Sequence, residues 1–152
     1  MANIILAEHG TPTAMTITLA SLASSTSRIG RQTDIVDNSD NAQIIHLYVG
    51  ITVGTTPTID KNIYIYLIKS DGTLRTDSAG ASDAAWSQTN ARLLGVIRVD
   101  AVTSNVQYQG EFTIYNPGLE WGIGLYHDTG TDLNSTEANS VLRFTTENQE
   151  VQ

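Results

Sequence analysis

The stretch from residue 44 to residue 69, IIHLYVGITVGTTPTIDKNIYIYLIK, constrains the fold most, because aliphatic residues occupy every second position in both of its halves. A period of two predicts β-strands, since successive side chains of a strand point to opposite faces of a sheet. β-Branched and aromatic residues dominate both halves, as is typical of half-buried strands. Gly54 and Pro57 separate the halves, and these residue types interrupt strands. The stretch therefore predicts a β-hairpin at the centre of the core.

Three tyrosines of this stretch, Tyr48, Tyr64 and Tyr66, fall on the face opposite the aliphatic one. They could form a contact with another subunit or a partner protein, because tyrosine offers a large, rigid contact surface. They could also stack on sugars, or pair with one another across strands on a solvated face. We favour the protein interface over the sugar platform.

Residues 70–92 form the longest segment without a strand pattern, and a loop of this length is typically functional or mobile. Its one large apolar residue, Trp86, either plugs the loop onto the core or anchors a protein interface, where tryptophan is enriched. Residues 82–86, SDAAW, are compatible with one helical turn that has Ser82 as its N-cap.

Further strands are expected from weaker alternation at residues 14–20, 30–37, 93–102, 108–115, 119–127 and 140–147. About eight short strands separated by turns indicate an all-β protein, an antiparallel β-sandwich. A jelly roll is the first choice of topology, because it also protects the sheet edges. An immunoglobulin-like sandwich is second and an up-and-down barrel is third. In the strand at 119–127, Gly122 and Gly124 leave one face flat enough for another backbone to approach.

A length of 152 residues fits one domain, and we expect residues 13–152 to form it, preceded by an extended arm at residues 1–12. Three adjacent aliphatic residues, Ile4, Ile5 and Leu6, need burial somewhere. They indicate an arm that contacts a neighbouring subunit or partner, the alternative being a disordered or edge-strand terminus.

Composition argues against several classes of protein. The chain has no cysteine, so it can form neither disulfides nor thiolate metal sites. A net charge of −8 argues against a nucleic-acid partner. No apolar run approaches the ~20 residues of a membrane-spanning helix, so no membrane association is expected. The first nine residues lack a basic region, and we expect no signal peptide.

Motifs of catalysis and metal binding are missing from the sequence. There is no Gly-x-Ser-x-Gly elbow, and the three histidines, His9, His46 and His127, show no short ligand spacing. His46 is expected to be a solvated or interface residue. Glu111 and Glu120 flank a turn, but both alternate outward with polar residues, which is typical of solvated carboxylates rather than a glycosidase pair.

Residues 128–134 form an oxygen-rich loop that lacks the complete calcium-loop pattern. We therefore predict a non-enzymatic protein without a metal or another cofactor.

Residues 13–38, TAMTITLASLASSTSRIGRQTDIVDN, and residues 58–72, TIDKNIYIYLIKSDG, resemble small virion proteins of tailed bacteriophages. The specific similarities are the LASLASS step from Leu19 to Ser25 and the run GRQTDIVDN from Gly30 to Asn38. The resemblance covers about a third of the chain. An acidic chain without cysteine, with strands rich in Thr, Ser and Asn, fits the same group.

This resemblance implies a head decoration (cement) protein or an auxiliary virion protein, made in the host cytoplasm and located on the capsid surface. Such proteins bind the major capsid protein, often as homotrimers, and many reach capsid subunits with an N-terminal arm, which would suit residues 2–12. The expected interface residues are then Ile4, Ile5 and Leu6 of the arm, together with Tyr48, Tyr64, Tyr66 and Trp86. The alternative is a carbohydrate- or receptor-binding β-sandwich module of a phage tail.

Overall fold

The computed structural model describes residues 5–80 and 83–151. These residues form eleven β-strands and one short 3₁₀ helix, η1 (Glu137–Asn139). The strands, in chain order, are β1 (Ile5–His9), β2 (Thr13–Ala14), β3 (Ile29–Gln32), β4 (Val36–Asp37), β5 (Ile44–Thr52), β6 (Lys61–Ser70), β7 (Ala85–Ser87), β8 (Arg92–Val99), β9 (Gln107–Tyr115), β10 (Glu120–His127) and β11 (Val141–Val151). In the part of the chain so described, no helix has the length and apolar character needed to cross a membrane.

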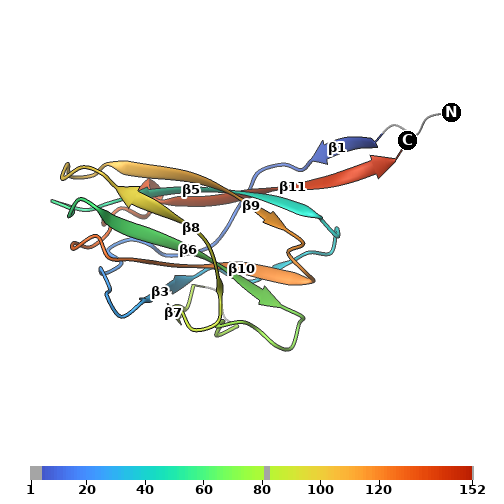
Figure 1. The fold of residues 1–152 in the computed structure, drawn as a ribbon, viewed down its shortest axis with the longest axis horizontal. Helices are drawn as coiled ribbons and strands as arrows, with labels where there is room; N and C mark the ends of the chain where they lie inside the picture. Colours follow the sequence, from blue (N-terminus) through green and yellow to red (C-terminus); the bar gives the residue numbers. More distant parts are fainter. Residues whose placement is uncertain (1–4, 81–82, 152) are drawn as a thin grey trace.

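The strands build two antiparallel sheets that pack face to face (Figure 1). The first sheet has the order β1-β11-β5-β9, with β2 also paired to β11. The second has the order β7-β3-β10-β6-β8, with β4 also paired to β10. The predicted β-sandwich is thereby confirmed. The jelly roll stays a prediction, which the repeated passage of consecutive strands from one sheet to the other supports.

The predicted hairpin of β5 and β6 is wrong, because the two strands lie in different sheets. Ile45 and Leu47 of β5 and Ile63 and Ile65 of β6 are all fully buried. Two strands that face each other across a core show the same alternation as two neighbours in one sheet. The alternation therefore identified the buried face of each strand correctly but could not say which sheet each strand joins.

A second, smaller core covers the outer face of the second sheet, where residues 83–92 fold over it. This core contains Tyr66, Ile68, Trp86, Ala91 and Tyr126. A Cβ atom on Gly124 would lie 2.5 Å from the indole ring of Trp86. The flat face predicted at the β10 glycines therefore exists, but residues of the same chain fill it: Trp86 lies over Gly124 and Ile35 over Gly122.

The predicted helical turn at residues 82–86 is wrong where the structure describes it. Residues Ala85–Ser87 form strand β7, which pairs with β3; Ser82 lies outside the described residues. Asp83 accepts hydrogen bonds from the hydroxyl and the amide of Thr18. Burial raises the pKa of Asp83, but these bonds outweigh it and, with the nearby Arg31 charge, hold the pKa below its ordinary value. The loop is thus tied to the N-terminal part of the sandwich.

The segment at residues 14–20 alternates as predicted but is not a regular strand beyond β2. Met15, Ile17 and Leu19 point into the core. The amides of Leu19 and Ala20 donate to the carboxylate of Glu137, at 2.9 Å and 2.6 Å. A carboxylate thus replaces the neighbouring strand as the acceptor for this backbone.

Strand β1 and the end of β11 form a two-stranded ribbon that reaches past the two sheets (Figure 1). Residue Glu147 is the last of β11 to pair with β5, and residues 148–151 pair with β1. The predicted arm is therefore held as a strand over residues 5–9. Ile5 and Leu6 lie opposite Val151 and Glu150 in this ribbon, whereas Ile4 lies outside the described residues.

Candidate functional site

The outer face of the first sheet presents aligned side chains from β9, β5 and β11. Tyr48 at the centre lies between Glu111 on β9 and Arg143 on β11. In the next row, Gly50 lies between Gln109 and Val141. Each row spans three neighbouring strands, so the register of the sheet positions an aromatic ring between a carboxylate and a guanidinium.

A groove of about 530 Å³ follows these rows. Its polar lining comes from Tyr48, Gln107, Gln109, Glu111 and Arg143. Gly50 carries no side chain, and the end of Gln107 lies over it. Tyr48 is 44% exposed. An accessible ring among amides and charges of both signs can bind a peptide segment or a sugar.

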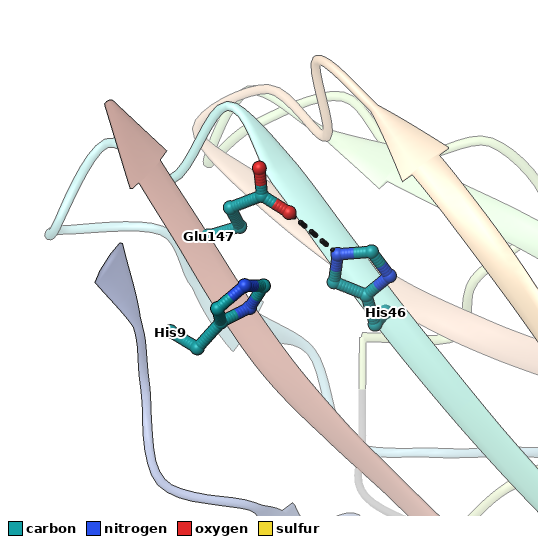
Figure 2. Close-up of side chains that lie close together, drawn as sticks. All are labelled: His9, His46 and Glu147. Carbon is teal, nitrogen blue, oxygen red and sulfur yellow. Dashed lines mark hydrogen bonds and ion pairs between the residues drawn. The ribbon is translucent and has the colours of Figure 1, made fainter. Parts of the chain in front are cut away.

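A cluster of His9, His46 and Glu147 lies on the same outer face, at the base of the ribbon (Figure 2). Nε2 of His46 lies 2.8 Å from Oε2 of Glu147. The rings of His9 and His46 are 5.8 Å apart between centroids. One potential ligand atom from each of the three side chains lies within 4.8 Å of the other two. On its other side, Nδ1 of His46 lies 3.7 Å from Oε1 of Glu111.

The fold brings this cluster together from three strands. His9 at the end of β1 lies directly opposite Glu147 of β11. His46 of β5 lies opposite Thr145, two residues away on the same face of β11. The sequence predicted an exposed or interface histidine at position 46 but missed the cluster. Only the register of β1, β11 and β5 reveals it, and no local motif encodes that register.

The tyrosines predicted to share one face do not do so. Tyr48 lies on the outer face of the first sheet, and Tyr64 and Tyr66 lie on the outer face of the second sheet. Tyr64 stacks on Tyr126 at 4.6 Å between ring centroids, and Tyr66 lies 5.4 Å from Trp86. The prediction of a single tyrosine face was wrong because it rested on the hairpin.

Trp86 and Tyr66 are only 2% and 7% exposed. The structure therefore agrees with the interpretation of Trp86 as a plug, and within a single chain neither ring offers much surface to a partner. Tyr48, the most exposed of the predicted aromatic residues, is the one that lines the groove. Its contact with another molecule stays a prediction.

In the part of the chain that the structure describes, Glu111, Glu120 and His127 do not form a further cluster of potential metal ligands. Glu111 and Glu120 belong to different sheets. Glu111 is exposed as expected, but the expectation of a solvated carboxylate was wrong for Glu120, which is half-buried and accepts a hydrogen bond from the hydroxyl of Ser70. His127 is buried, with Nε2 at 2.9 Å from the carbonyl oxygen of Leu22 and Nδ1 at 3.0 Å from the hydroxyl of Thr129. Burial lowers the pKa of His127, although the Leu22 carbonyl and two nearby aspartates oppose this effect. Both ring nitrogens are engaged inside the protein, so His127 serves structure.

Comparisons with protein-family models, with curated proteins and with solved structures found no match. The resemblance of residues 13–38 and 58–72 to phage virion proteins therefore stays a prediction. The candidate functional surfaces are the ribbon, the groove beside Tyr48 and the histidine cluster between them.

Proposed function

We propose that this chain is a non-enzymatic virion protein of a tailed bacteriophage that decorates the capsid and stabilises it by bridging major capsid protein subunits. The observation that carries the proposal is the ribbon of β1 and the end of β11. Among the described residues, no strand pairs with the outer edge of β1, nor with β11 beyond Glu147 on the side of β5. Such edges present free backbone donors and acceptors to which a partner can add a strand.

The sequence resemblance and the position of the ribbon support the same function. An arm that reaches past the sandwich can contact a capsid subunit while the sandwich rests on a neighbouring subunit. A homo-oligomer, with a trimer favoured, would carry several ribbons at once. Because each further contact is then intramolecular, many weak attachments give strong overall binding.

The test is co-sedimentation of the purified full-length protein with capsids that lack it. The full chain should sediment with the capsids, and a variant without residues 2–9 should stay in the supernatant. Among the residues whose burial the structure describes, the hydrophobic core begins at Met15, so the variant should remain folded. Leu74→Ala is a suitable control, since Leu74 is exposed in the loop of the second sheet. Full decoration by the ribbon-deleted variant would contradict the proposal.

A second candidate function is carbohydrate or receptor binding by a module of a phage tail, and the groove beside Tyr48 favours it. The exposed ring of Tyr48, flanked by Glu111 and Arg143, is suited to stacking on a sugar and bonding its hydroxyl groups. Binding on a glycan array should then be lost in Tyr48→Ala and kept in Tyr115→Ala, which changes another exposed tyrosine. A negative array for the wild-type protein would argue against this candidate.

A further inference from the structure

We propose that His9, His46 and Glu147 form a binding site for a Zn²⁺ ion that fixes the ribbon to the sandwich. The three side chains come from β1, β5 and β11 and point toward one another (Figure 2). The proposal rests on this arrangement alone and is independent of what the protein attaches to.

The distances suit a zinc ion after a small adjustment. Zinc binds imidazole nitrogen and carboxylate oxygen at about 2.0–2.2 Å, so two ligand atoms of a tetrahedral site lie about 3.4 Å apart. The potential ligand atoms here lie within 4.8 Å of one another. His46 and Glu147 are closer than a metal requires, at 2.8 Å. His9 is exposed and sits at the end of β1, so its ring can move toward the other two.

The types of ligand atom in this cluster favour zinc over magnesium and calcium. Two imidazoles and one carboxylate form a ligand set found in zinc sites that keep an open position for water. Magnesium and calcium prefer sites made of oxygen atoms alone. In the metal-free chain, the carboxylate of Glu147 can only accept, so Nε2–H of His46 donates the bond between them. The zinc ion would replace this proton and keep both atoms as partners.

Glu111 is a fourth residue of the site, and it would orient the ring of His46. Histidine ligands usually donate their second ring N–H to a carboxylate or carbonyl, which fixes the ring and its tautomer. Oε1 of Glu111 lies 3.7 Å from Nδ1 of His46, and its side chain is 58% exposed and free to rotate closer. In the zinc-bound site, Nδ1–H of His46 would be directed at Glu111, and Nε2, which has lost its proton, would bind the ion beside His9 and Glu147. Glu111 is therefore a positioning residue rather than a ligand.

A zinc ion at this position would restrict the movement of the ribbon relative to the sandwich. β1 pairs with β11, whereas β5 lies on the opposite side of β11. An ion held by His9 and His46 would cross β11 and connect β1 to β5 directly. Because Glu147 is the residue where β11 leaves β5 and continues into the ribbon, the ion would fix the direction of the ribbon relative to the sandwich.

The test is calorimetric titration of the full-length protein, without an affinity tag, with ZnCl₂, and a parallel titration with Co²⁺ followed by visible absorption. We expect one ion per chain and a Co²⁺ spectrum typical of four or five ligands. His9→Ala, His46→Ala and Glu147→Gln should each weaken zinc binding at least tenfold. Glu8→Gln is the control matched to Glu147→Gln. It removes the same charge, but from the face of β1 opposite to His9.

Hydrogen exchange measures the mechanical part of the proposal. Zinc should slow exchange of the β1 amides that pair with β11, and His9→Ala should abolish this effect. His9 is exposed and lies outside the core, so this variant tests the site without threatening the fold. Absence of a stoichiometric ion, undiminished binding in His46→Ala and Glu147→Gln, or one ion for two chains would each overturn the proposal.

Discussion

The indole ring of Trp86 occupies the space above Gly124 that a side chain at position 124 would fill. An added Cβ would lie 2.5 Å from Cε2 of the indole. Tyr66 and Tyr126 lie beside the same indole, with ring centroids 5.4 Å and 6.5 Å away. Gly124 on the central strand β10 thus lets Trp86 of β7 pack against the second sheet.

Gly124→Ala should therefore displace Trp86 and destabilise the protein by about 1–3 kcal/mol, the usual cost of overpacking a core. Urea unfolding measures the free energy of unfolding, and a red shift of tryptophan fluorescence reports exposure of the indole. Gly50→Ala is the matched control on another central strand, because its Cβ would meet only the flexible side chain of Gln107. Equal stability of the two variants would contradict the role assigned to Gly124.

The carboxylate of Glu137 should hold the irregular segment that precedes β3. It accepts the amides of Leu19 and Ala20, and Leu19 is fully buried. Glu137→Ala should lower the free energy of unfolding by about 1 kcal/mol. Hydrogen bonds to charged groups typically contribute about 1.5–3 kcal/mol, and the effect is smaller here because Glu137 is exposed. Glu8→Ala removes an equivalent charge from an exposed position, so urea unfolding of this variant should match the wild type. An unaltered midpoint in Glu137→Ala would count against the role.

Stability should fall on acidification because of His127. Burial holds the pKa of His127 below its unfolded value of 6.5, so below that pH the unfolded chain binds more protons than the folded protein. The contribution of neutral His127 is complete above about pH 6.5 and is lost as the pH falls toward the lowered folded-state pKa. An NMR titration of the three histidine rings would measure this pKa directly. A ring of His127 that titrates at or above 6.5 in the folded protein would contradict the prediction.

Glu111→Gln should weaken zinc binding by about tenfold to a hundredfold, the range typical of groups that orient a ligand. The ion should still bind, because His9, His46 and Glu147 remain. Calorimetry at one fixed pH measures the change, with Gln109→Ala as the neighbouring control on the same face of β9. Unchanged affinity in Glu111→Gln would remove Glu111 from the site and leave the three ligands in place.

The alternation of residues predicted the buried faces well. Ile45 and Ile63 are both fully buried as expected, because a period of two determines the face of a strand. It could not assign β5 and β6 to different sheets, because that choice depends on contacts with β11 and β10. The mistaken hairpin then placed Tyr48 beside Tyr64, although the two lie on opposite sides of the sandwich.

The histidine cluster was beyond sequence analysis for a related reason. His46 and Glu147 are 101 residues apart, and each looks like an ordinary outward residue of its own strand. Trp86 differs, since the sequence allowed both a plug and an interface anchor. Where the loop packs depends on the space above Gly124, and this glycine was the sign of that space in the sequence.

Quantitative mass spectrometry of purified virions of the tailed phage that is proposed to encode this chain tests capsid decoration most directly. A capsid-decorating protein is predicted to be present in hundreds of copies, in a fixed ratio to the major capsid protein. Its absence from the virions, or a handful of copies as expected of a tail component, would contradict capsid decoration.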